Sequence, residues 1–156
     1  MILVSACLLG LDCRYDGSAL QADRRVTGII DEVMIPVCPE QMGGLPTPRL
    51  PSEITEGDGN DVLDGISGVV NSAGLDVTVE FLKGARVALS IARIAGVTRA
   101  IMKERSPSCG VVHITRNRES IPGMGVAAAL LKRAGIQVVS SDRIIEDYVR
   151  YHRHWK

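Results

Sequence analysis

One stretch decides the fold: VTVEFLKGARVALSIARIAGVTRAIMK, residues 77–103. Its first part repeats apolar residues at helical spacing, and Gly96 suits the position that follows the end of a helix. The run at 99–103 then has the length and apolar character of a buried strand. We therefore predict a helix over 77–95 followed directly by a strand over 99–103.

The same alternation continues toward the C-terminus. The sequence predicts a helix over 125–134, a strand over 136–140 and a closing helix from Asp142 to about His152. Alternating strands and helices are typical of a parallel sheet with helices on both faces. The predicted fold class is therefore α/β, a Rossmann-like three-layer sandwich with a mostly parallel sheet, and residues 1–156 are expected to form one domain.

The N-terminal half adds two more predicted strands. Residues 1–8 form a continuous apolar run, as in a strand covered on both faces. Residues 33–38 form the second, where Pro36 lacks an N–H and implies an edge position or a bulge. A short helix is expected within 18–31. The Gly-, Pro- and Asp-rich segment 39–74 is expected to be a binding loop followed by a hairpin or a flexible excursion.

The composition excludes several classes of protein. Hydrophobic residues make up 46% of the 156 residues and aromatic residues only 3%, so the core must be mainly aliphatic. Lys plus Arg and Asp plus Glu both number 18, so nucleic acid is an improbable partner and a small neutral ligand is favoured. No apolar run approaches the roughly 18 residues that span a bilayer. We expect a cytoplasmic protein that does not bind membranes, and the oligomeric state is left open.

Three cysteines share one position relative to the predicted strands. Cys7 lies near the end of the first apolar run, Cys38 ends the second, and Cys109 lies just beyond the strand at 99–103. Parallel strands deliver their carboxyl ends to one edge of the sheet, where ligands bind. Disulfides are rare in a reducing compartment. The sequence therefore predicts that the three thiols converge on one metal-sulfur site.

Cysteines at such positions have other common uses. Buried cysteines often serve as small hydrophobic residues. A zinc site is disfavoured because the chain has no Cys-x-x-Cys pair, whereas an iron-sulfur cluster accepts thiolates from distant segments. A cluster held by three cysteines leaves one iron open for substrate. Cys13 is interpreted as a non-ligand, and the alternative is that it completes the coordination.

Three polar residues are predicted at the same edge. Glu40 follows Cys38 by two residues and is a candidate general base, although a loop carboxylate that faces water is equally compatible with the spacing. Ser106 and Ser108 precede Cys109 and are candidates for hydrogen bonds to cluster sulfur or to a ligand, or for moving a proton. The alternative is a plain turn in which both hydroxyls bind backbone.

Three motifs resemble a known family. They are VSACLLG (4–10) with CRYDG (13–17), CPE (38–40) with GGLPTPR (43–49), and KERSPSCG (103–110). In this order they resemble the DUF523 proteins, whose characterised members are thiouracil desulfurases. The resemblance spans nearly the whole chain, although Ser141 stands where many members have Glu.

The resemblance implies a [4Fe-4S] cluster held by Cys7, Cys38 and Cys109. It also implies that Glu40 and one motif serine, assigned to Ser106 with Ser108 in reserve, are catalytic. The expected activity is hydrolytic removal of sulfur from a thiolated base such as 2-thiouracil, without net redox change. Two alternatives are a non-catalytic redox sensor or interaction module that binds a metal or cluster, and a nucleotide-binding Rossmann-like protein with structural cysteines.

Overall fold

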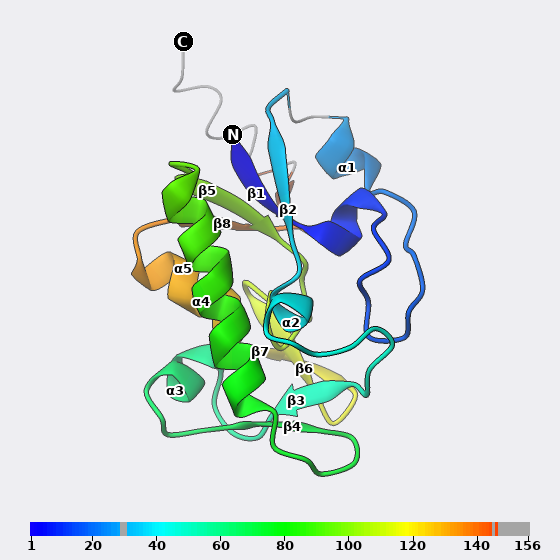
Figure 1. The fold of residues 1–156 in the computed structure, drawn as a ribbon, viewed down its shortest axis with the longest axis vertical. Helices are drawn as coiled ribbons and strands as arrows, with labels where there is room; N and C mark the ends of the chain where they lie inside the picture. Colours follow the sequence, from blue (N-terminus) through cyan, green and yellow to red (C-terminus); the bar gives the residue numbers. More distant parts are fainter. Residues whose placement is uncertain (29–30, 145, 147–156) are drawn as a thin grey trace.

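The central sheet has four parallel strands in the order β2-β1-β5-β8 (Figure 1). The computed structural model describes residues 1–28, 31–144 and 146. The strands are β1 (Ile2–Ser5), β2 (Met34–Val37), β5 (Arg99–Met102) and β8 (Gln137–Ser140). The predicted parallel sheet is confirmed. So is the edge position that Pro36 implied, since β2 is the outer neighbour of β1.

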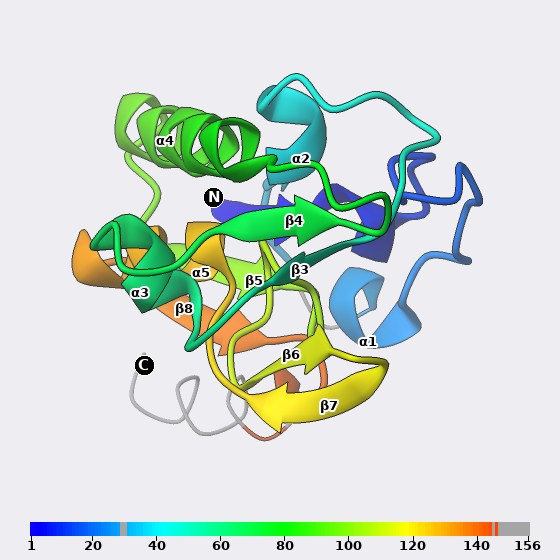
Figure 2. The same ribbon diagram turned by 90° about the horizontal axis from the view of Figure 1, so that it is seen from below.

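Helices cover both faces of this sheet. Successive residues of a strand point to opposite faces, and β1 separates them accordingly. Leu3 packs in the main core cluster with α4 (Thr78–Ile94) and α5 (Val126–Arg133), whereas Ile2 and Val4 pack with Val26 of α1 (Arg24–Thr27). Figure 2 shows α4 and α1 on opposite sides of the sheet. The predicted three-layer arrangement is confirmed.

Helix α4 matches its prediction closely. Asp76 accepts a hydrogen bond from the Thr78 backbone N–H at 2.8 Å at its start, and Gly96 takes the left-handed conformation just after its end, with a φ of 64°. Gly84 faces inward and is buried. A Cβ there would overlap the Pro39 carbonyl oxygen, so this glycine allows the helix α2 (Pro39–Met42) to pack closely against α4.

The segment 39–74 is more ordered than predicted. It contains α2, β3 (Ser52–Ile54), α3 (Gly59–Leu63) and β4 (Val69–Asn71). Strands β3 and β4 pair antiparallel, which confirms a hairpin in outline. The alternative prediction, a flexible excursion, does not describe this segment. Asp58 and Asp61 form a capping box that starts α3 between the two strands of the hairpin.

Two further differences concern segments near the predicted site. β1 ends at Ser5, and a 3-10 helix, η1 (Ala6–Leu9), replaces the second half of the strand predicted over 1–8. The antiparallel pair β6 (His113–Arg116) and β7 (Glu119–Pro122) was not predicted. The short helix expected within 18–31 is present as α1.

Two sequence expectations can be compared with the structure only within the described residues. The predicted closing helix from Asp142 to His152 falls largely on residues outside the described ranges. Among the helices that are described, none is long and apolar enough to cross a membrane.

Candidate active site

A cavity of about 760 Å³ lies at the carboxyl edge of the parallel sheet. Ser5 and Val37, the last residues of β1 and β2, and Lys103, which follows β5, form part of its wall. Every residue that the sequence singled out also lines it, namely Cys7, Cys13, Cys38, Glu40, Ser106, Ser108 and Cys109. The topology thus brings together side chains that lie far apart in the sequence.

Different local structures present the thiols to this cavity. Cys7 lies on η1, Cys38 is the residue that precedes α2, and Cys109 lies in the loop after β5. Cys13 is buried, and its carbonyl oxygen lies 3.6 Å from Cys38 Sγ, which donates to it. All four cysteines are free.

The environment favours the neutral form of Cys13, Cys38 and Cys109. Burial raises the pKa of Cys109 to about 12. A hydrogen bond with Cys13, together with burial, raises the pKa of Cys38 well above its ordinary value. For Cys13, a hydrogen bond with Cys38 lowers the pKa, but a hydrogen bond with Cys7 and burial outweigh it and raise the pKa to about 11. A bound metal reverses this preference, because metal coordination deprotonates a thiol.

Thiols from separate segments are a donor set of the kind that an iron-sulfur cluster takes. Within the described residues, no group of three or more His, Cys, Asp or Glu side chains is arranged to hold a metal ion. A tetrahedral zinc ion needs four ligands at about 2.0 to 2.3 Å from one point. An iron-sulfur cluster fills more space and takes thiolates from separate segments, as the thiols around this cavity are placed.

Glu40 is fixed by partners on both of its oxygens. It lies in the first turn of α2, and its Oε2 accepts a hydrogen bond from Arg49 Nε at 2.5 Å. Its Oε1 accepts one from Ser108 Oγ at 2.9 Å. The side chains of Arg49 and Glu40 are only 6% and 14% exposed, so this is a nearly buried ion pair rather than a surface contact.

The two serines form a chain that leads away from Glu40. The hydroxyl oxygens of Ser106 and Ser108 are 3.1 Å apart, so Ser106 reaches Glu40 through Ser108. Ser106 Oγ also accepts hydrogen bonds from the backbone N–H groups of Ser108 at 3.2 Å and Cys109 at 3.1 Å. The turn-forming interpretation of Ser106 therefore describes part of what this hydroxyl does.

Arg49 is a site residue that the sequence analysis did not single out. Besides Glu40, its guanidinium donates to the Cys13 carbonyl at 2.9 Å and to the Pro46 carbonyl at 3.3 Å. Arg49 therefore ties α2, the segment around Cys13 and its own loop together. The signal was present, since Arg49 ends the GGLPTPR motif, but the sequence does not show that it pairs with Glu40.

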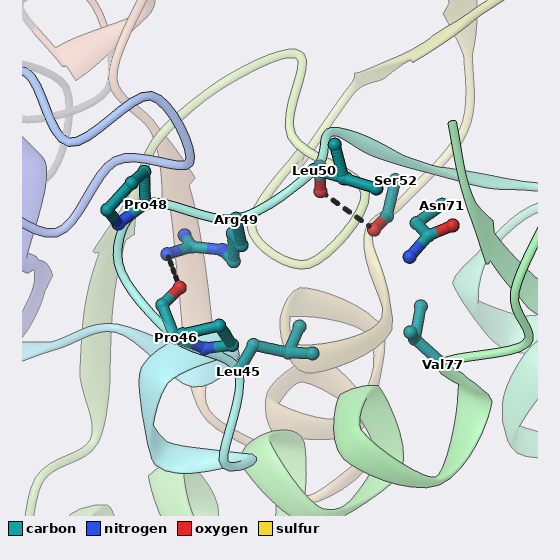
Figure 3. Close-up of a pocket in the computed structure, with 8 residues that line it drawn as sticks. All are labelled: Leu45, Pro46, Pro48, Arg49, Leu50, Ser52, Asn71 and Val77. Atoms are coloured by element: carbon teal, nitrogen blue, oxygen red, sulfur yellow. Dashed lines mark hydrogen bonds between the residues drawn. The ribbon is translucent and has the colours of Figure 1, made fainter. Parts of the chain in front are cut away.

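A second cavity, of about 460 Å³, lies against Arg49 (Figure 3). Its wall is mostly apolar and is formed by Leu45, Pro46, Pro48, Arg49, Leu50, Ser52, Asn71 and Val77. Arg49, Ser52 and Asn71 line both cavities. The thiols, the carboxylate of Glu40 and the two serines belong to the larger cavity, which is therefore the candidate active site.

Comparison with known proteins points to one family. A family model described as 2-thiouracil desulfurase matches residues 2–143. The uncharacterised protein YbbK of Bacillus subtilis (strain 168) is 43% identical over 148 residues, which cover 92% of this chain and 97% of YbbK. The solved structure of the [4Fe-4S]-dependent thiouracil desulfidase TudS is 41% identical, with a TM-score of 0.80 and 97% of each chain covered.

Proposed function

The chain belongs to the 2-thiouracil desulfurase family, and on this basis we propose that it is a [4Fe-4S]-dependent enzyme that hydrolyses the C=S bond of a thiolated nucleobase such as 2-thiouracil. One observation carries the proposal: the three candidate cysteine ligands, Glu40 and the two serines line a single cavity. The family match over residues 2–143 supports one domain for residues 1–156.

We assign the cluster to Cys7, Cys38 and Cys109. These thiols reach the cavity from segments that follow three adjacent parallel strands. Cys13 has a supporting role, because its carbonyl accepts a hydrogen bond from Arg49. The hydrogen bond from the Cys38 thiol belongs to the metal-free protein, since a cluster-bound thiolate has no proton to donate. When bound, a cluster with one open iron supplies a Lewis acid that polarises the C=S bond of the substrate.

Glu40 is the general base of the proposed reaction. Arg49 holds Oε2, so Oε1 is the oxygen that takes a proton from the attacking water. Ser108 bridges Oε1 to Ser106 and gives the proton a path toward the departing sulfur. The water oxygen replaces sulfur on the carbon, and both water protons leave with the sulfur as hydrogen sulfide. No electrons are exchanged.

The decisive experiment measures sulfide release from 2-thiouracil by protein reconstituted without oxygen. E40Q removes the basic oxygen and keeps the size of the side chain, and we expect turnover to fall about 100-fold or more while the visible absorption of the cluster remains. E53Q is the matched control, since Glu53 lines the same cavity but binds the Asn117 backbone N–H; its turnover should stay near that of the wild type.

Two results would contradict the proposal in different ways. If wild-type protein carries a full cluster but releases no sulfide from 2-thiouracil, the substrate assignment is wrong. Activity of E40Q within about twofold of the wild type would remove the role of Glu40 as a general base, since such groups contribute far more. A redox sensor without catalysis would release no sulfide in any of these samples.

A further inference from the structure

One buried carboxylate near the site has no role in the proposed reaction. Glu104 is only 3% exposed. Its Oε1 accepts three backbone N–H groups, from Val111 at 2.9 Å, Val112 at 2.9 Å and His113 at 2.8 Å. Its Oε2 accepts the hydroxyl of Ser140 at the end of β8. Both oxygens are thus fully engaged within the protein.

These contacts close the loop that carries the reactive residues. Glu104 stands at the start of the loop and the three amides at its end, and Ser106, Ser108 and Cys109 lie between them. The Glu104 backbone N–H also donates to Ser141 Oγ at 3.2 Å. One side chain therefore joins both ends of the loop 104–113 to the neighbouring strand β8.

The loop has a second, independent attachment on its other side. The first turn of α5 donates backbone hydrogen bonds from Val126 to the Pro107 carbonyl and from Ala127 to the Ser108 carbonyl, both at 2.9 Å. A Cβ on Gly125 would overlap the backbone of Ser108, so the contact is close. Loss of Glu104 should therefore loosen one side of the loop and leave the other side docked.

Fold stability alone is a poor explanation for a charge at this position. A buried carboxylate has a large desolvation cost, and apolar side chains often stabilise a protein as well or better. An ionised carboxylate can accept hydrogen bonds from three backbone N–H groups on one oxygen. These bonds fix the direction of the backbone between residues 111 and 113. Such a clamp serves a loop whose side chains need fixed positions.

We propose that Glu104 is a positioning residue that holds Cys109, Ser106 and Ser108 in place in the cavity. The roles of Cys109, Ser106 and Ser108 in the reaction rest on the proposed function. The clamp, by which we mean the hydrogen bonds of the Glu104 carboxylate, does not rest on it and is tested on metal-free protein. The competing explanation is that Glu104 only contributes to global stability.

The test measures how fast each cysteine of reduced, metal-free protein is alkylated by N-ethylmaleimide, read by mass spectrometry. Cys109 is buried, so its alkylation reports opening of the loop, and Cys7 in the same molecule is the reference. In E104A we expect the ratio of the Cys109 rate to the Cys7 rate to rise about tenfold or more, because local opening becomes easier. E104Q should give a smaller rise, since its amide oxygen still accepts from the three N–H groups.

D76N is the matched control. Asp76 also accepts a backbone N–H, that of Thr78, but at the start of α4 and away from the loop. Its ratio should equal that of the wild type. A ratio unchanged in E104A, or raised equally in D76N, would overturn the proposal. If E104A does not fold, E104Q is compared with the wild type in the same way. An unchanged ratio of the Cys109 and Cys7 alkylation rates in E104Q would then contradict the proposal.

A second measurement separates this inference from the proposed function. In cluster-loaded protein, E104Q should lower kcat for 2-thiouracil more than it raises KM, because the loop positions reacting groups. If wild-type protein releases no sulfide, the proposed function is wrong, but the conclusion from the alkylation rates is unaffected. If the wild type is active but the ratio of the Cys109 and Cys7 alkylation rates is unchanged in the Glu104 variants, only the proposed role of Glu104 is wrong.

Discussion

The ion pair between Arg49 and Glu40 gives the sharpest quantitative prediction. Their side chains are 6% and 14% exposed and their nearest atoms are 2.5 Å apart. Removing one partner of a buried pair leaves an uncompensated charge and typically costs about 3 to 5 kcal/mol. We therefore expect R49M to lower the free energy of unfolding by about this amount, although methionine fills much of the same volume.

A double-mutant cycle isolates the pair from the other contacts of Arg49. E40Q alone leaves the guanidinium without its anion, whereas E40Q with R49M removes both charges. The double variant should lose less than the sum of the two single variants, with a coupling energy of about 1.5 to 3 kcal/mol. Urea unfolding of the metal-free protein measures all four free energies, and similar m-values would show that the unfolded states are comparable.

A surface ion pair of the same protein is the control. Arg133 and Asp64 pair at 2.7 Å, but their side chains are 41% and 48% exposed. R133M should therefore cost less than about 1 kcal/mol. A cost for R49M that is equally small, or additive effects in the cycle with Glu40, would show that Arg49 does not hold the carboxylate as inferred.

Four further predictions follow from other contacts. Intrinsic helix propensity predicts that G84A stabilises the protein by up to about 1 kcal/mol, but overlap with the Pro39 carbonyl predicts a loss of about 1 to 3 kcal/mol; a gain in urea unfolding would contradict the packing. Burial raises the pKa of Glu104, but the hydrogen bonds from Ser140 and from backbone amides together outweigh it and hold the pKa below its ordinary value of 4.5. The stability that ionised Glu104 contributes is thus complete above the pKa of the unfolded chain and is lost as pH falls through the lower folded pKa. The free energy of unfolding in urea should therefore fall as the pH is lowered below about 4.5, and the fall should be smaller in E104Q; an equal fall in both proteins would contradict this. S108A should lower sulfide release at least as much as S106A, because Ser108 is the direct partner of Glu40; a defect in S106A alone would remove Ser108 from the path. Stripping the cluster with a chelator should abolish sulfide release and leave cooperative urea unfolding, because the core is built mainly from aliphatic side chains; non-cooperative unfolding would mean that the metal is structural.

The sequence predicted those parts of the fold that depend on strong periodicity. The helix at 77–95, the strand at 99–103 and the edge position of Pro36 follow from local rules about apolar spacing and a missing N–H. The placement of Cys7, Cys38 and Cys109 at one edge follows from topology, because parallel strands finish on the same side. These are features that many residues specify together.

What the sequence did not predict depends on contacts between distant residues. The turn of the β6–β7 pair places Asn117 and Arg118 in the left-handed region, with φ of 51° and 63°. Turns of this kind favour Asn but not Arg, so the local signal was weak. The pairing of Arg49 with Glu40 and the burial of Glu104 are set by tertiary packing, and no spacing along the chain encodes them.

The thiols that we propose as cluster ligands lie far apart in the sequence. Cys38 lies 31 residues after Cys7, and Cys109 follows 71 residues later. No short stretch of the sequence therefore carries the three proposed ligands. If these cysteines hold the cluster, the complete ligand set exists only after β1, β2 and β5 have assembled side by side.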